Sequence, residues 1–205
     1  MLADKTLKIF LEETASNTPV PGGGSIAALS AGLASALTEM VANLTIGKKN
    51  YEDLEEEMKS IVKETSKYRE RFIEDIDRDS DSFNGVMAAF KLPKGTEEEK
   101  EIRKNSIETA MKNAALVPLE VAKNALDMMS LVEKVIEKGN KNAVTDGAVA
   151  AMMARTAVLS ALYNVKINLG SIKDAVFVEK VGKEVEQIEE NAWKIEKDLL
   201  GKVKL

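Results

Sequence analysis

The feature that most constrains this chain is a run from Tyr51 to Phe90 in which apolar residues recur every three or four positions, with one gap of seven. This spacing predicts one long helix with a single buried face. At 1.5 Å per residue that helix would be ~60 Å long. A compact domain of 205 residues has a diameter of only ~43 Å. We therefore expect an intertwined homodimer, unless the helix breaks near Asp77–Asp81.

Two other segments, Ser25–Ile46 and Gly147–Asn168, consist mainly of alanine, glycine, serine and aliphatic residues. Because they are small or apolar on nearly every side, we expect both to be fully buried helices. Each follows a polar loop rich in glycine or asparagine. The two segments are candidates for a degenerate internal pair.

The remaining helices are predicted from caps and periodicity. Asp4 is a candidate N-cap for a helix to Ala15 whose apolar face is formed by Leu7, Phe10 and Leu11. Thr96 and Glu99 form a capping box for a helix that reaches Lys138 and should kink or restart at Pro118. A final amphipathic helix runs from about Phe177 to Leu199. The predicted fold is therefore all-α, a single multi-helical bundle over residues 1–205.

The composition excludes several chemistries. The chain has no cysteine and no histidine, which leaves neither disulfides nor the usual zinc ligands, and we expect no metal. Acid–base chemistry near neutral pH would then fall to carboxylates, lysine or tyrosine. A net charge of −5 without a dense basic face argues against nucleic acid. With no signal peptide or membrane span evident, we expect a cytoplasmic protein. The single glutamine beside abundant lysine and glutamate is typical of a thermophile.

Two loop motifs are candidate anion sites. Pro21, Gly22, Gly23, Gly24 and Ser25 directly precede a helix, where free N–H groups and the helix dipole favour an anion. The alternative is a flexible turn between helices. Lys48 and Lys49 follow the first small-residue helix and are candidates for holding a carboxylated ligand. They would equally complement the helix C-terminus.

Asp79 fills the gap of seven in the long apolar stripe, between Ile76 and Phe83. A carboxylate in a core stripe needs a partner, a ligand or a proton. The alternative is a bend near Asp77–Asp81 that exposes all three acids to solvent. Asp146 opens the second small-residue helix and is most simply an N-cap or first-turn acid. Asn164 and Asn168 lie four apart on one face, where buried amides satisfy loops or contact a ligand.

The ordered set of motifs resembles the cyclodeaminase/cyclohydrolase family of folate enzymes. The resemblance covers essentially the whole chain. The segments that carry it are Pro21–Ser25, Met40–Thr45, Gly47–Lys49, Asp79–Phe83, Lys91–Lys94, Val117–Ala122, Gly139–Asn140, Thr145–Asp146, Asn164–Leu169 and Asp174. The family often has serine where this chain has Thr145, a change that keeps the hydroxyl.

The resemblance implies an all-helical intertwined dimer with a tetrahydrofolate substrate near the subunit interface and no further cofactor. The main expectation is a 5-formiminotetrahydrofolate cyclodeaminase, and the alternative is a methenyltetrahydrofolate cyclohydrolase. Asp79 and Asp146 are the expected acid–base or electrostatic pair. Substrate contacts are expected from Gly22–Ser25, Lys48 and Lys49, with Asn164, Asn168 and Asp174 at the pterin edge. A non-catalytic helical interaction protein is the competing class.

Overall fold

The computed structural model describes residues 1–204, which form six α-helices and contain no strand. The helices are α1 (Leu7–Thr14), α2 (Gly23–Asn43), α3 (Glu55–Phe90), α4 (Glu97–Lys138), α5 (Val144–Leu169) and α6 (Ala175–Gly201). Short 3-10 turns precede α1, α3 and α5. The predicted all-α bundle with long helices is confirmed.

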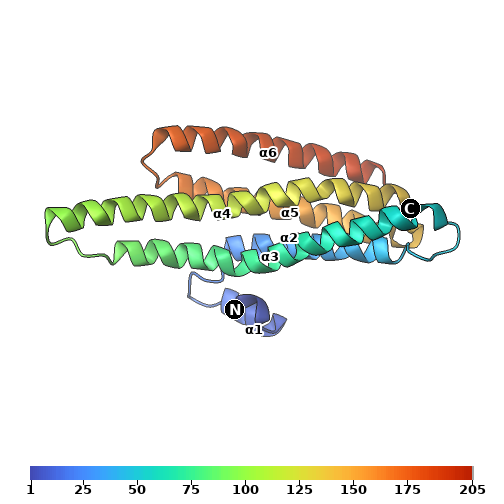
Figure 1. Ribbon diagram of the computed structural model, residues 1–205, viewed down its shortest axis with the longest axis horizontal. Helices are drawn as coiled ribbons and strands as arrows, with labels where there is room; N and C mark the ends of the chain where they lie inside the picture. The colour runs from blue at the N-terminus through green and yellow to red at the C-terminus, as the bar shows by residue number, and fades with distance from the viewer. Residues whose placement is uncertain (205) are drawn as a thin grey trace.

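The two longest helices form an antiparallel hairpin that sets the length of the molecule (Figure 1). α3 has 36 residues and α4 has 42, corresponding to axial lengths of ~54 and ~63 Å. α3 does not break at Asp77–Asp81. The single chain accommodates such helices because the bundle is elongated, so helix length alone does not require a second subunit.

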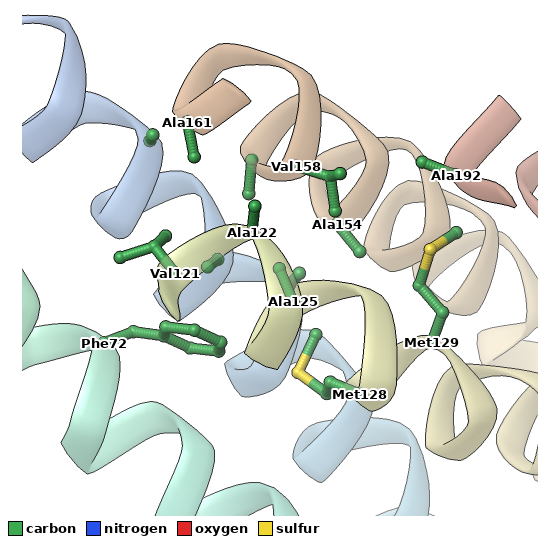
Figure 2. Close-up of a cluster of buried hydrophobic side chains, with 14 of the residues drawn as sticks. Phe72, Val121, Ala122, Ala125, Met128, Met129, Ala154, Val158, Ala161 and Ala192 are labelled. Carbon is green, nitrogen blue, oxygen red and sulfur yellow. The ribbon is translucent and has the colours of Figure 1, made fainter. Parts of the chain in front are cut away.

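The core is aliphatic and rich in alanine, as the composition indicated. Figure 2 shows alanines of α4 and α5 facing each other, among them Ala122, Ala125, Ala154 and Ala161, all essentially inaccessible to solvent. Such small side chains let the helix backbones approach closely. Phe72 from α3 fills the neighbouring space and is also completely buried.

α2 and α5, the two small-residue helices, pack against each other. They run antiparallel, because Gly23 at the start of α2 lies beside Asn164 near the end of α5. The expectation of complete burial was wrong for the single chain. Leu33 and Met40 of α2 and its C-cap Leu44 remain exposed, as do four apolar residues of α5: Val149, Met152, Tyr163 and Ile167. Both helices therefore bury their small residues and leave an apolar stripe outside.

These two segments also bear on membrane insertion. Gly23–Asn43 and Lys141–Leu169 are long and apolar enough to span a bilayer, judged by length and composition alone. Core helices of soluble proteins meet the same criteria. About half of the apolar 18-residue window in each segment is buried inside this chain, 56% and 50%. A soluble, cytoplasmic protein without a membrane span stays a prediction.

Pro118 lies inside α4 without interrupting it, so the predicted restart of the helix is wrong. Proline has no N–H, so the carbonyl of Ala114, four residues earlier, loses its helical partner. The side-chain amide Nδ2 of Asn168 donates to that carbonyl at 2.7 Å. A side chain from α5 thus satisfies the acceptor that Pro118 leaves open.

The N-terminal segment differs from its prediction. Thr6, and not Asp4, is the N-cap of α1, its hydroxyl accepting from the N–H of Ile9 at 3.3 Å. Asp4 ends a 3-10 turn, whose Leu2 and Ala3 N–H groups donate to Asp77. Of the predicted apolar face only Phe10 is buried, while Leu7 and Leu11 are exposed. In contrast, the capping box of Thr96 and Glu99 is confirmed.

Candidate functional site

The best candidate for a chemical centre is Asp79, which lies on α3 against the first turn of α2. The hydroxyl of Ser25 lies 3.2 Å from Asp79 Oδ2, 3.0 Å from the carbonyl of Ile76 and 3.2 Å from the hydroxyl of Ser80. Asp79 therefore sits at the positive end of the α2 dipole. The stripe position proposed from the sequence is confirmed, and the alternative of a bend that solvates all three acids is wrong.

The carboxylate approaches this closely because Gly24 has no side chain. A Cβ at Gly24 would lie 1.9 Å from Asp79 Oδ1 and 2.4 Å from Cγ, so the carboxylate could not keep this position. The sequence predicted a loop as far as Gly24, but α2 begins at Gly23. Gly23 and Gly24 thus form the start of α2, against which the carboxylate of Asp79 packs. The alternative of a flexible interhelical turn is wrong for these two residues.

Asp79 is half-buried and has no countercharge beside it. Burial raises the pKa of Asp79 above the ordinary aspartate value, and hydrogen bonds from Ser25 oppose this shift without cancelling it. Among residues 1–204 no arginine or lysine forms an ion pair with Asp79. A carboxylate in this state is well suited to accept a proton or to stabilise a bound cation.

Asp79 faces a cavity of about 340 Å³ between α2, α3, α4 and α5, which we call the Asp79 cavity. Of the residues that the sequence had suggested, Gly22, Gly23, Gly24, Asn164 and Asn168 line this cavity, whereas Ser25 does not. Its apolar walls were not foreseen. They are formed by apolar residues of the loop before α2 and of α3, α4 and α5, which carry no distinguishing signal in the sequence: Pro19, Val20, Phe83, Val86, Met111, Ala114 and Ile167.

The two asparagines present amides to this cavity from α5. Asn164 donates to the carbonyl of Ser160 at 2.9 Å, and its Nδ2 would lie 3.2 Å from a Cβ on Gly23. Asn168 is held by its bond to Ala114. Because each Nδ2 is engaged in the helical framework, the orientation of both side chains is set before any ligand binds.

Lys48, Lys49 and Asp146 lie at the other end of the α2–α5 pair. Asp146 is a first-turn acid of α5, eighteen positions before Asn164, or ~27 Å along the helix. A single chain therefore does not bring Asp146 to the Asp79 cavity. The sequence could not show this, because the starts of two antiparallel helices lie at opposite ends of the bundle.

Lys48 nevertheless occupies an organised site. Its ammonium donates to Asn140 Oδ1 and lies 5.7 Å from the centre of the Tyr51 ring. Asn140 in turn donates to the carbonyl of Leu44 at 3.0 Å and accepts from the N–H of Asn142. Gly47 and Asn50 flank the lysines with φ values of 69° and 73°, in the left-handed region. Lys48 is half-buried, whereas Lys49 is exposed.

Asp174 has a structural role in this chain. Its carboxylate accepts from the N–H of Phe177 at 3.0 Å as the N-cap of α6, and from Lys112 at 2.7 Å. The hydrogen bond from Lys112 lowers the pKa of Asp174. Asp174 does not line the Asp79 cavity, although Ser171 in the same loop does. The expectation that it contacts a pterin ring is not supported by this geometry.

Comparison with known proteins places this site in context. Residues 6–187 match the family model described as formiminotransferase-cyclodeaminase. A methenyltetrahydrofolate cyclohydrolase from Methylorubrum extorquens is 39% identical over 91% of this chain and 89% of its own. A formimidoyltransferase-cyclodeaminase from Rattus norvegicus is 32% identical over 87% of this chain, which spans only 33% of that relative.

A solved structure has the same fold. The crystal structure of a formiminotetrahydrofolate cyclodeaminase from Thermotoga maritima is 32% identical, with a TM-score of 0.88 over 99% of this chain and 98% of that one. The relatives that cover the chain are enzymes of folate one-carbon metabolism. The chain therefore belongs to the formiminotransferase-cyclodeaminase family, and is a formimidoyltetrahydrofolate cyclodeaminase or a methenyltetrahydrofolate cyclohydrolase.

Proposed function

We propose that this protein is a methenyltetrahydrofolate cyclohydrolase, which converts 5,10-methenyltetrahydrofolate to 10-formyltetrahydrofolate. The cyclohydrolase from Methylorubrum extorquens supports this assignment, because its similarity extends over most of both chains. The sequence had favoured the cyclodeaminase, with the cyclohydrolase as its alternative. The observation that carries the chemistry is the half-buried carboxylate of Asp79, which faces a cavity without a countercharge.

Asp79 supplies what the reaction requires. Its negative charge stabilises the cationic methenyl carbon between N5 and N10. Water adds to that carbon while Asp79 accepts the proton, and a tetrahedral intermediate forms. The bond from carbon to N5 then breaks as N5 takes up a proton, leaving the formyl group on N10. The net reaction consumes one water and releases one proton, and needs no cofactor beyond the folate substrate.

The second candidate is the cyclodeaminase reaction, favoured by the name and fold of the Thermotoga maritima protein. Here N10 attacks the formimino carbon attached to N5, and ammonia leaves to give the methenyl compound. The same cavity serves both reactions, because both pass through one carbon held between N5 and N10. Asp79 would then accept the N10 proton and pass it to the departing amine.

One absorbance assay distinguishes these functions. With 5,10-methenyltetrahydrofolate, a cyclohydrolase accelerates the loss of the methenyl absorbance. With 5-formiminotetrahydrofolate, a cyclodeaminase produces a rise in the same band. We expect the accelerated loss. A rise from the formimino substrate without hydrolysis of the methenyl substrate would favour the second candidate, and no change with either would contradict both.

We further propose that two copies pair through the apolar stripe of α2 and α5. The exposed Leu33, Met40 and Met152 belong to this stripe, and apolar surface of this kind is stabilised by burial against a partner. If the copies are antiparallel, Lys48 and Asp146 of one lie at the Asp79 cavity of the other. This arrangement unites the predicted site residues, which a single chain keeps ~27 Å apart.

Subunit complementation tests the shared site. The Asp79→Asn and Lys48→Ala variants are each expected to be inactive, whereas a mixture refolded together should regain activity. A dimer with one chain of each variant has one intact site, formed by Asp79 of one chain and Lys48 of the other. Light scattering should give twice the mass of one chain, and Met152→Glu should reduce it. Activity in a monomeric protein, or no recovery on mixing, would contradict the shared site.

A further inference from the structure

A second cavity lies next to the Asp79 cavity, beside the α3–α4 hairpin. It has a volume of about 450 Å³ and shares Met111 and Ser171 with the Asp79 cavity. We call it the Arg103 cavity. On α3 it reaches Phe90, eleven positions after Asp79, so the two cavities together extend ~16 Å along the helix. The two cavities are therefore neighbours, and we treat them together as one trough with two ends.

The trough changes chemical character along its length. At one end lies the half-buried carboxylate of Asp79, which has no cation beside it. The middle is apolar and is lined by Phe83, Val86 and Met111. The far end is lined by Arg103, Lys104 and Lys173, with Glu108 as its one acid. An elongated ligand that fits this order has a cationic head, an aromatic or apolar centre and an anionic tail.

Arg103 is fixed in place before any ligand binds. Its Nε and Nη2 donate to the carbonyl of Phe90 at 3.3 and 3.1 Å, and its guanidinium lies 5.8 Å from the centre of the Phe90 ring. The side chain is half-buried. A guanidinium held in this way loses little conformational freedom when it binds a carboxylate, which favours binding.

Glu108 does not neutralise this end of the trough by direct pairing with the cations. Its carboxylate accepts the main-chain N–H groups of Lys173 and Asp174, each at 3.2 Å. These bonds hold the loop between α5 and α6 against α4 and so position Lys173 at the rim. The exposed ammonium groups of Lys173 and Lys104 then add to the charge of Arg103.

We propose that the Arg103 cavity binds the carboxylates of the substrate's glutamyl tail, with Arg103 and Lys173 as the principal contacts. This inference rests on the proposed folate chemistry at Asp79. The sequence had suggested Lys48 and Lys49 for the glutamate, but within one chain both lie beyond the opposite end of α2. In the proposed dimer, Lys48 of the other copy would lie at the Asp79 end of the trough, away from the tail. Binding the tail at Arg103 places the p-aminobenzoyl ring over the apolar middle and the one-carbon unit beside Asp79.

The test compares two substrates that differ only in the tail: 5,10-methenyltetrahydrofolate and 5,10-methenyltetrahydropteroate, which lacks the glutamate. In the Arg103→Ala/Lys173→Ala variant we expect KM for the first substrate to rise roughly 10-fold with little change in kcat, because charge-assisted bonds are lost. KM for the pteroate substrate should not change, which also shows that the variant is folded. Lys180→Ala/Lys194→Ala, with the same change in charge on α6, is the matched control.

The outcomes separate this inference from the proposed function. If the wild-type protein hydrolyses both substrates with equal KM, the folate chemistry stands and the tail site is wrong. If the double variant raises KM equally for both substrates, or if the control variant has the same effect, Arg103 and Lys173 do not recognise the tail. If neither substrate is turned over, the proposed function fails and the tail site fails with it.

Discussion

Asp75 and Asp79 lie one helical turn apart on α3 and have different surroundings: Asp75 is buried, whereas Asp79 is half-buried. Asp75 is completely buried, pairs with Arg78 and lies 3.4 Å from Arg71. Arg71 and Arg78 also contact Glu120 of α4, at 3.1 Å and 2.9 Å respectively. Asp79 has only hydroxyl partners, a helix N-terminus and a cavity. Arginines balance the charge of Asp75 inside the protein, whereas we propose that the substrate balances the charge of Asp79.

The largest expected effect comes from Asp79→Asn, which keeps the shape and removes the charge. We expect turnover to fall by roughly 10³-fold, within the range for loss of a general base. Asp75→Asn, one turn away, is the matched control and should retain activity within several-fold. Steady-state kinetics on both variants tests the contrast. Equal losses would show that the two carboxylates do not differ in function.

The same substitution has an opposite consequence for stability. Because burial raises the pKa of Asp79, ionisation opposes folding, and this penalty grows as pH rises from the unfolded pKa to the folded one. Asp79→Asn should therefore raise Tm at pH 7, and the gain should disappear below pH ~4, where aspartate is protonated in both states. Thermal unfolding across this pH range measures the effect. A lower Tm at pH 7 would contradict it.

Gly24→Ala should have the next largest effect. The new methyl group cannot share space with Asp79, whose carboxylate must rotate away or move with α3. We expect turnover to fall on the order of 10²-fold, since small displacements at a reacting centre have effects of this size. Gly182→Ala, where a Cβ meets nothing within 4 Å, is the control and should leave kcat unchanged. Unaltered kinetics of Gly24→Ala would remove Asp79 from the reaction.

Arg78→Ala tests the balanced carboxylate. It leaves Asp75 buried beside Arg71 alone, and should cost about 2 kcal/mol of unfolding free energy at pH 7. Since burial raises the pKa of Asp75 and the contact with Arg78 lowers it, the loss should shrink as acid protonates Asp75. Urea denaturation at pH 7 and at acid pH measures this difference. A pH-independent loss would mean that packing, not charge, is responsible.

The smallest expected effect concerns Asn168. Asn168→Ala leaves the carbonyl of Ala114 without a donor and should cost about 1 kcal/mol. In a Pro118→Ala background an N–H is restored to that carbonyl, so the same substitution should cost less. Unfolding free energies for the two single variants and the double variant complete the cycle. Strict additivity would show that Asn168 does not compensate for the proline.

The helices, the Thr96 capping box and the unusual position of Asp79 were predictable from local pattern. The spacing of three and four residues reports which face of a helix is buried, and a carboxylate on that face is visible in the sequence. The contrast between Asp75 and Asp79 was not predictable, because it depends on which neighbouring helix faces each residue. Arg78 belongs to the same stretch, but Glu120 and Gly24 are distant in the chain.

The location of Asp146 shows the same limit. Its local setting, the first turn of a small-residue helix, was correctly recognised. Its distance from Asp79 follows from the antiparallel packing of α2 and α5, which no local pattern encodes. The exposed stripe on these two helices was missed for a related reason. Apolar residues in a sequence indicate that a surface is stabilised by burial, but they do not indicate whether the same chain or another molecule buries it.

The bond between Asn168 and Ala114 has a consequence for how this family can vary. Asn168 lines the Asp79 cavity and donates to the carbonyl of Ala114, to which the buried Pro118 of α4 cannot donate because it has no N–H. Replacing Asn168 to suit another ligand would strand that carbonyl, whereas losing the proline would release the amide from its fixed orientation. We therefore expect these two positions to covary among homologues, which links the evolution of the cavity to a core residue of another helix.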